Sequence, residues 1–486
     1  YNYGEGCFTK NYTLHSLTYI TTDAFETPGG THLDTGITID TLNNQSFYRL
    51  TIIGTNPNGV QLWQKSYGNF KFQYLNNNFT SRSLIYNNDC FYLYSIAKDS
   101  NNKYLSVLIK FNFNGDTLWQ KKYYDATDYL YVQSVCKSVD NGFLMTGFFE
   151  GTLRTCLLIK TDSSGTELWR KKLVKSTAPQ TQAGARILQD TLSKKIIIAG
   201  YEYQWDGTQP GGFSGYGNII ILDSLGIELQ RKTYSGFCGS IFLDLIQTKD
   251  KNFIAVGYND QCDNLSGPLG TRRNKSYVVK FNVNNITIPL WKKEIDITTP
   301  SNGISSLNEL TNGNLVLAGT IDTLVNHNIP EKGMLRVIKM DMNGNIVWKK
   351  YLSRDNIQSN SNVAMSIDKC LNGGFLIAVQ LVYASNPKPY TITKIDSTGC
   401  DSTIAYCQTV GLKEIKNNTE IINIYPNPTN DILNIKLDDF LDFENYRIKV
   451  VNVLGQTIME TKLEKKLNIS CLKNGIYFLQ VFDKGK

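Results

Sequence analysis

Short apolar runs separated by polar turns recur along the first 400 residues of the chain. Three of them read VLIKFNFNGDTLWQKKY (107–123), LLIKTDSSGTELWRKKL (157–173) and RVIKMDMNGNIVWKKYL (336–352). Each holds an apolar segment of strand length, an Asx-x-x-Gly turn and a second segment with Trp and Lys. The Asx side chain can bond the backbone two residues on, and Gly adopts the left-handed conformation of tight hairpins. The pattern therefore predicts β-hairpins.

The turn occurs seven times, and from Gly59 to Gly399 the mean spacing is about 57 residues. A second hairpin with a polar turn lies upstream in most repeats, as in SVDNGFLMTGFF (138–149) and LTNGNLVLAGTI (310–321). Two hairpins make a four-stranded unit, so we predict an all-β fold with a seven-bladed β-propeller over residues 1–403. A β-solenoid is the alternative, although its coils are usually shorter. The turns are Asn56–Gly59, Asn112–Gly115, Asp162–Gly165, Asp223–Gly226, Asn282–Asn285, Asp341–Gly344 and Asp396–Gly399.

A Trp follows the turn glycine by four residues in most repeats. Gln230 replaces it in one repeat, and Trp291 is displaced by a two-residue insertion. We interpret these Trp residues as packing between neighbouring sheets, with an aromatic ladder for sugars as the alternative. The Lys two positions later is interpreted as a charge that protects a blade edge. The Trp residues are Trp63, Trp119, Trp169 and Trp348, and the Lys residues are Lys65, Lys121, Lys171, Lys232, Lys293 and Lys350.

The two ends of the repeat region complement each other. After Gly399 the chain continues without the Trp and Lys of an outer strand, whereas residues 8–12 (FTKNY) match residues 63–67 (WQKSY) with Phe in place of Trp. We therefore expect the N-terminal strand to pair into the last blade and close the ring, because an open ring would leave two bare sheet edges.

Composition narrows the class of protein. The net charge is +7, and residues 420–486 hold nine basic and nine acidic side chains, so the excess lies upstream. There is no Lys/Arg block, which argues against a nucleic-acid partner, and no apolar run of transmembrane length. Tyr1 is interpreted as the first residue of a processed chain. The ten cysteines lack zinc-site spacing and are interpreted as disulfides of an exported protein.

No catalytic constellation is evident. The three histidines, His15, His32 and His327, are far apart and lie in segments read as loop or edge, where a solvated side chain is expected. FNFNGD (111–116) and MDMNGN (340–345) weakly resemble calcium loops but coincide with hairpin turns. We therefore predict a non-catalytic binding protein without catalytic residues, metal or cofactor, whose propeller takes a glycan or a protein. The alternative is a secreted hydrolase or lyase with its site in the propeller channel.

Past Gly399 the pattern changes: residues 404–419 read as a linker, and residues 420–486 as short alternating strands. IYPNPTNDILNIKL (424–437), KVVNVLGQTI (449–458) and LKNGIYFLQVF (472–482) carry the distinctive positions. This segment resembles the type A C-terminal sorting domain of the type IX secretion system, and the repeats are similar to those of Bacteroidota surface propellers. The matching residues are Tyr425, Pro426, Asn427, Pro428, Asn452, Gly455, Gly475, Tyr477 and Val481.

The resemblance implies a small Ig-like β-sandwich, here apparently without its final strand. It also implies export to the cell surface through an outer-membrane shuttle and a translocon. Family members often carry a Cys pair near the end of the last repeat, which suggests a disulfide between Cys400 and Cys407. Cys238 and Cys262, which flank one hairpin, are a second candidate pair. Bacteroidota export systems O-glycosylate an Asp-Ser/Thr-aliphatic motif, with Met or Thr also accepted last. It is matched at Thr41, Thr117, Thr191, Ser224, Thr323, Ser397 and Ser402.

Overall fold

A computed structural model describes most of the repeat region and much of the C-terminal segment. The described residues are 8–12, 18–42, 45–69, 73–75, 83–87, 89–151, 154–174, 180–205, 213–235, 239–261, 273–295, 301–323, 332–352, 361–371, 373–382, 390–399, 423–426, 428–436, 446–452, 456–472 and 474–483. The chain folds into two compact units, Tyr1–Gln408 and Thr409–Lys486. Within the described residues every regular element is a β-strand.

The strands of the first unit form groups of four, or of five in group two, and we number the groups in chain order. Group one holds β2 (Thr18–Glu26), β3 (His32–Leu42), β4 (Gln45–Thr55) and β5 (Gln61–Tyr67). Group two holds β6 (Gln73–Leu75), β7 (Leu84–Asn87), β8 (Cys90–Lys98), β9 (Tyr104–Phe111) and β10 (Thr117–Tyr123). Group three holds β11 (Tyr129–Lys137), β12 (Phe143–Glu150), β13 (Arg154–Thr161) and β14 (Glu167–Leu173). Group four holds β15 (Gln180–Gln189), β16 (Ile196–Trp205), β17 (Phe213–Leu222) and β18 (Glu228–Ser235).

Groups five and six share one sheet through a single parallel pair, Asn274 with Ser301. Group five holds β19 (Gly239–Gln247), β20 (Phe253–Gln261), β21 (Arg273–Phe281) and β22 (Trp291–Ile295). Group six holds β23 (Ser301–Glu309), β24 (Leu315–Thr323), β25 (Lys332–Met340) and β26 (Ile346–Leu352). Group seven holds β27 (Ser361–Lys369), β28 (Phe375–Val382), β29 (Tyr390–Ile395) and β1 (Phe8–Tyr12). Within each group the strands pair antiparallel.

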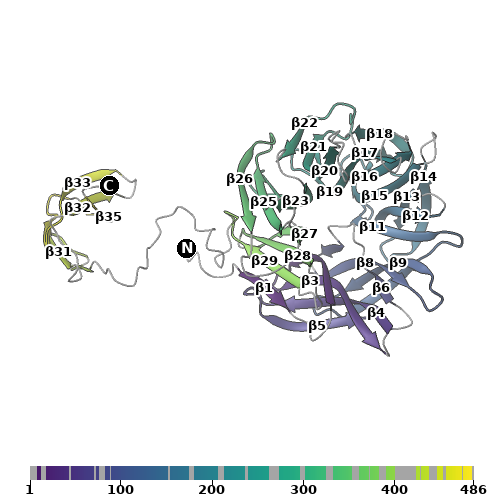
Figure 1. The fold of residues 1–486 in the computed structure, drawn as a ribbon, viewed down its shortest axis with the longest axis horizontal. Helices are drawn as coiled ribbons and strands as arrows, with labels where there is room; N and C mark the ends of the chain where they lie inside the picture. The colour runs from purple at the N-terminus through teal and green to yellow at the C-terminus, as the bar shows by residue number, and fades with distance from the viewer. Residues whose placement is uncertain are drawn as a thin grey trace. The chain divides into compact units, whose positions relative to one another are not determined.

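The groups follow one another around a common centre, as Figure 1 shows. The first strands lie against one another, β11 beside β15, β15 beside β19, β19 beside β23, β23 beside β27, and β27 beside β2. A separate apolar cluster fills each space between neighbouring groups. The space between groups seven and one is filled in the same way, by Met365 and Ile392 against Ala24 and Ile53. The all-β, propeller-like fold follows from this ring of sheets.

The N-terminal strand lies in the last group. β1 pairs antiparallel with β29, in a register that places Phe8 opposite Lys394 and Tyr12 opposite Tyr390. The two segments lie side by side at the start and end of the ring (Figure 1). The outer strand of group seven therefore comes from the beginning of the chain.

The predicted packing role of the Trp residues is confirmed. A Cβ on Gly115 would lie 2.9 Å from the Trp63 ring, and a Cβ on Gly399 would lie 2.5 Å from Trp348, so each Trp covers the turn glycine of the next group. The same contact joins Trp119 with Gly165, Trp169 with Gly226 and Trp291 with Gly344. The lysines reach across as well: Lys65 pairs with Asp116 of group two. These residues therefore bind neighbouring groups together and do more than guard an edge.

The two exceptions to the repeat meet at one contact. Gln230 of group four takes the place of Trp, and the turn that it faces in group five carries Asn285 in place of Gly. The Gln230 side-chain amide donates to the Asn284 carbonyl at 3.1 Å and accepts the Ile286 N–H at 3.2 Å. A Trp here would meet the Cβ of Asn285, so a smaller polar side chain replaces it.

The C-terminal unit contains two three-stranded sheets. One has β30 (Asn423–Tyr425), β31 (Ile432–Lys436) and β34 (Lys466–Asn468), and the other has β33 (Thr457–Lys462), β32 (Tyr446–Asn452) and β35 (Tyr477–Asp483). Its core is formed by Leu433, Ile435, Ile448, Val450, Leu463 and Leu467. The predicted linker, residues 404–419, lies outside the described residues.

Candidate functional site

Six of the first strands carry a register shift near the centre of the ring. The residue after each shift is polar, and these residues form what we call the polar belt: Asp23, Ser134, Arg186, Asp244, Ser306 and Ser366. A β-bulge turns such a side chain out of the regular alternation.

The polar belt joins six pairs of neighbouring groups. Ser366 Oγ accepts the Ala24 N–H at 3.2 Å, Asp23 accepts the Leu84 N–H at 3.0 Å, and Ser134 Oγ accepts the Ile187 N–H at 3.2 Å. Asp244 accepts the Leu307 N–H at 3.0 Å, and Ser306 Oγ accepts the Ile367 N–H at 3.3 Å. Arg186 instead forms an ion pair with Asp244 at 3.1 Å. Because these oxygens satisfy buried backbone groups, we assign the belt to the scaffold and not to chemistry.

A buried ionic cluster lies where group seven meets group one. His32 begins β3 and is 0% exposed, so its placement in a solvated loop or edge was wrong. Its Nε2 lies 3.0 Å from Glu26 and 3.1 Å from Lys394 Nζ, and the Lys394 ammonium lies 3.2 Å from Glu26. Burial alone would raise the pKa of Glu26, but hydrogen bonds from His32 and Leu371 and the charge of Lys394 lower it to about 2. His15 and His327 lie outside the described residues.

This cluster holds the groups together and does not reach a substrate. The side chains of His32, Glu26 and Lys394 are 0%, 4% and 2% exposed. Three such groups inside a protein stabilise it only when they satisfy one another, which they do here. Among the described residues, no group of three or more His, Cys, Asp and Glu side chains could hold a metal ion.

Groups three and four bring aromatic side chains together with an ion pair. We define the tyrosine cluster as Tyr131, Phe148, Arg154, Tyr201 and Tyr203. The Tyr131 and Phe148 rings stack at 4.9 Å, and the Arg154 guanidinium lies 4.7 Å from the Phe148 ring centre. Tyr201 and Tyr203 meet edge to face at 5.5 Å. Apolar contacts join Phe148 and Tyr201 with Tyr131 and Tyr203 in one cluster.

The tyrosine cluster can donate hydrogen bonds and bind charge. Burial raises the pKa of Tyr131 to about 12, and burial raises that of Tyr201 although Arg154 opposes it, so both phenols stay protonated at neutral pH. Arg154 Nε bonds Glu150 at 2.9 Å, and these side chains are 36% and 34% exposed. Partly exposed aromatic faces beside a guanidinium and a carboxylate are suited to a sugar ring with polar substituents.

Sequence reasoning missed the tyrosine cluster because its members come from different strands. The aromatic ladder weighed for the Trp residues does not fit them, since they cover turn glycines. Tyrosine is abundant in this chain, with 28 residues. The signal was therefore diluted, and no spacing distinguished Tyr131 and Tyr201 from the rest.

Two sorting motifs, far apart in sequence, converge in the C-terminal unit. A cavity of about 290 Å³ is lined by Pro428 of the YPNP segment and by Gly475 and Tyr477 of the G-x-Y segment. Tyr425 is 53% exposed, while Tyr477 and Val481 pack partly against the core. Asn452 closes a hairpin by accepting the Gln456 N–H at 3.0 Å. Asn427 and Gly455 lie outside the described residues.

The cysteines differ from expectation where they are described. Cys90, Cys136 and Cys156 are buried free thiols, and Cys471 is an exposed one, so the interpretation of all ten as disulfides is wrong for these four. Burial raises the pKa of Cys136 to about 12 and that of Cys156 to about 11, which makes these thiols unreactive. Cys400, Cys407, Cys238 and Cys262 lie outside the described residues.

The candidate glycosylation positions fall into three classes. Thr117, Thr191, Ser224 and Ser397 have exposed side chains. Thr41 and Thr323 lie in β3 and β24. Ser402 is outside the described residues.

Several solved structures resemble the first unit. An ulvan lyase of polysaccharide lyase family 25 is 12% identical with a TM-score of 0.44, covering 78% of this chain and 95% of its own. An α-L-arabinofuranosidase from Fusarium graminearum is 9% identical with a TM-score of 0.42, covering 81% and 99%. The NanB sialidase from Streptococcus pneumoniae is 10% identical with a TM-score of 0.37, covering 81% and 70%.

One curated relative matches part of the chain. Beta-agarase D from Zobellia galactanivorans is 33% identical over 63 residues, which is 13% of this chain and 12% of the agarase. The chain thus matches about an eighth of that protein. The sialidase, the lyase, the arabinofuranosidase and the agarase are all enzymes, and the prediction that this chain is not an enzyme is contradicted by them.

The C-terminal unit matches a known protein family. Residues 423–486 match the secretion system C-terminal sorting domain. No helix among the described residues is long and apolar enough to cross a membrane. The chain carries a type IX sorting domain behind a propeller-like unit and is exported to the cell surface or the extracellular space.

Proposed function

We propose that the exported chain is a hydrolase or lyase that cleaves an extracellular polysaccharide, with the tyrosine cluster as its active site. The observation that supports this proposal is the partly exposed Arg154–Glu150 ion pair, set among Tyr131, Phe148 and Tyr203. Export places the enzyme beside polymers that are too large to enter the cell. The likeness to known propeller enzymes adds only the fold.

The residues would divide the work. The aromatic faces of Tyr131 and Tyr203 hold sugar rings, and their hydroxyls donate hydrogen bonds to the oxygen that leaves. Glu150 accepts a proton, from water in hydrolysis or from a sugar carbon in β-elimination. The departing oxygen takes a proton from a tyrosine phenol, and solvent carries the proton released by Glu150 back to that phenol. Arg154 fixes the Glu150 carboxylate through two contacts, at 2.9 and 3.1 Å, and offers positive charge to an acidic substituent.

The full chain should be incubated with a panel of neutral, carboxylated and sulfated polysaccharides. New reducing ends without ultraviolet absorbance identify a hydrolase, whereas reducing ends with absorbance from a new double bond identify a lyase. Glu150→Gln and Arg154→Ala should each lower the rate by roughly 100-fold or more. Tyr351→Phe, an exposed tyrosine of group six, serves as the control. If no polymer is cleaved, or if all variants cleave alike, the proposal fails.

The sorting unit implies contact with the type IX secretion machinery. We propose that the surface around the 290 Å³ cavity is read by the outer-membrane shuttle and the translocon through residues 420–486. The linker at 404–419, the Cys400–Cys407 disulfide and the O-glycosylation of the Asp-Ser/Thr positions remain proposals. Intact mass and peptide mapping of the secreted protein would test the last two.

A further inference from the structure

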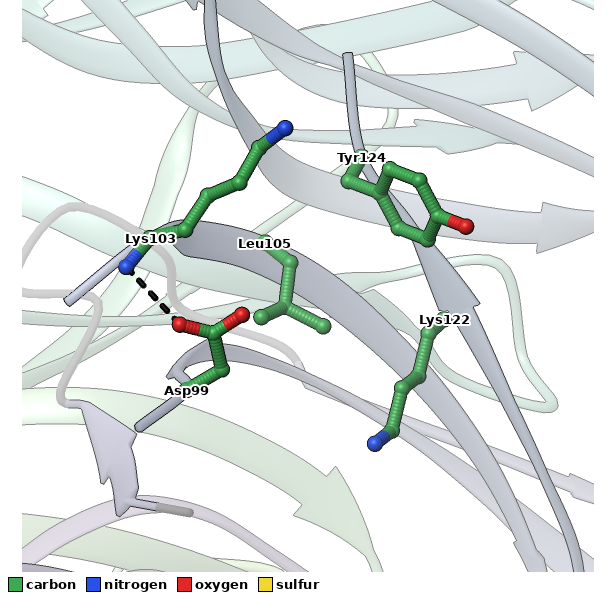
Figure 2. A pocket seen from close by; sticks show the side chains of 5 residues that line it. All are labelled: Asp99, Lys103, Leu105, Lys122 and Tyr124. Atoms are coloured by element: carbon green, nitrogen blue, oxygen red, sulfur yellow. Dashed lines mark hydrogen bonds between the residues drawn. The ribbon is translucent and has the colours of Figure 1, made fainter. Parts of the chain in front are cut away.

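A small pocket opens at one end of group two, lined by residues that the tyrosine cluster does not include. It is lined by Asp99, Lys103, Leu105, Lys122 and Tyr124 and has a volume of about 150 Å³. That is room for about five water molecules, much less than a site for a drug-sized ligand. Figure 2 shows the side chains arranged around Leu105: Lys122 comes from β10, Lys103 comes from the loop before β9, and their ammonium groups point in opposite directions. The size suits a single charged substituent on a sugar ring.

The charges in the pocket favour an anion. Lys103 and Lys122 supply two ammonium groups, and Asp99 supplies the opposing carboxylate among the lining residues. The Asp99 carboxylate already accepts the N–H groups of Asn101 at 2.8 Å and of Lys103 at 3.0 Å, as its own turn requires. A carboxylate or sulfate ester would therefore meet a net positive site.

An aromatic ring stands beside these charges. Tyr124 is 60% exposed, and the Lys103 ammonium lies 5.4 Å from its ring centre. The Tyr124 backbone is held in place, because Arg170 donates to its carbonyl at 3.1 Å. The next residue, Asp125, accepts the Thr127 N–H at 3.1 Å and forms an ion pair with Arg170. An exposed ring on an anchored backbone offers a surface for the apolar face of a sugar.

We propose that this pocket binds an acidic sugar unit of an extracellular polysaccharide, through its carboxylate or sulfate ester. The anion pairs with one of the two ammonium groups, Leu105 forms the floor, and Tyr124 stacks on the ring. The proposal names the substrate class for the enzyme proposed above, but binding itself requires no cleavage. It therefore stands or falls by a separate measurement.

Affinity electrophoresis of the full chain would test it, in gels that contain carrageenan (sulfated), polygalacturonate (carboxylated) or agarose (neutral). We expect retardation by at least one acidic polymer and little by agarose. The double variant Lys103→Ala with Lys122→Ala should weaken the apparent affinity by about fivefold or more, and Tyr124→Ala should also weaken it. Comparison of the two acidic gels shows whether carboxylate or sulfate is preferred.

Lys292→Ala with Lys349→Ala is the matched control, because it removes the same charge from exposed positions in groups five and six. An equal loss of apparent affinity in the control would show general electrostatic attraction and would overturn the proposed binding site. Equal retardation by agarose, or none by either acidic polymer, would overturn it as well. Reducing ends are measured on the same samples. Binding without cleavage refutes only the proposed enzyme activity. Cleavage without binding in the gels, at a rate that the double lysine variant does not change, refutes only the proposed pocket.

Discussion

Buried lysines recur at one position of the third strand in several groups, and their partners differ. Lys160 pairs with Asp140, and Lys280 pairs with Asp250 at 2.6 Å, each within its own group. Lys394 instead pairs with Glu26 of the neighbouring group, at 3.2 Å. His32 joins that pair from a position where other groups have Phe143, Phe253 or Phe375. An ion pair that elsewhere tightens one sheet here ties the last sheet to the first.

Removing one partner of the Glu26–Lys394 ion pair should lower the free energy of unfolding. Lys394→Met leaves the Glu26 carboxylate buried without its cation, and we expect a loss of about 3–5 kcal/mol in the free energy of unfolding. The double variant Glu26→Gln with Lys394→Met should recover part of that loss, since no charge is then left unpaired. Denaturant unfolding at neutral pH measures both. A single variant as stable as the parent would contradict the assignment.

The same carboxylate predicts an acid dependence. The pKa of Glu26 is about 2 when folded and near 4.3 when unfolded, so its contribution is complete above about pH 4.5 and is lost as the pH falls towards 2. The shift corresponds to about 3 kcal/mol. Between pH 7 and pH 2.5, the free energy of unfolding should fall more steeply with falling pH for the parent than for Glu26→Gln. Parallel curves would show that Glu26 is not the group concerned.

At the scale of elements, the Trp-on-Gly contact is the repeated joint between groups. It requires a residue without a Cβ in the turn, as at Gly115 beneath Trp63 and Gly399 beneath Trp348. Group four and group five break both halves of this rule together, with Gln230 and Asn285. The side chains at this joint are therefore still complementary, because the residues on both sides differ from the repeat.

This joint yields a double-mutant cycle. Gln230→Trp alone should destabilise the chain by about 1–3 kcal/mol, because the indole meets the Asn285 side chain. Gln230→Trp with Asn285→Gly should restore much of that stability by recreating the joint found elsewhere. The free energies of unfolding of the four proteins give the coupling directly. Effects that add to within about 0.5 kcal/mol would show that the two residues are independent.

Local signals determined what could be predicted. The turns, the Trp positions and the orphan strand at residues 8–12 repeat at fixed spacing, so the sequence reveals them. The polar belt mixes Asp, Ser and Arg, as at Asp23, Ser134 and Arg186, so no single residue type marked its positions. His32 and the tyrosine cluster depend on contacts between separate strands or groups. Spacing along the chain carries no information on such contacts.

At the scale of the whole molecule, the chain is a ring of sheets followed by an export signal. The ring has an apolar cluster at each joint, including the closing one between groups seven and one. The sorting unit has a separate core. Each unit is therefore stabilised by a hydrophobic core of its own, which is consistent with their separate functions.

Removal of residues 420–486 should leave the first unit in the periplasm, because the sorting domain directs passage across the outer membrane. Cell fractionation of the native organism, with blotting against the first unit, measures this. The full chain is the control and should appear at the surface or in the medium. Surface delivery of the truncated protein would show that another segment directs export.

Deletion of residues 1–12 should lower the melting temperature by about 5 °C or more, because it strips β1 from β29 and bares a sheet edge. A deletion of residues 1–7 alone, which keeps β1, is the matched control and should have a much smaller effect. Thermal unfolding followed by circular dichroism compares the three. Equal melting temperatures would mean that β1 contributes nothing to the ring.

The pairing of β1 with β29 also orders events in time. The ribosome makes Phe8–Tyr12 well before Tyr390–Ile395, so β1 must wait for its partner while the residues between them are synthesised and translocated. A nascent chain stopped anywhere in between is a gapped ring with bare strand edges, open to aggregation and proteolysis. Only a chain that includes its seventh group can close the ring, so an incomplete product keeps the bare edges of an open one.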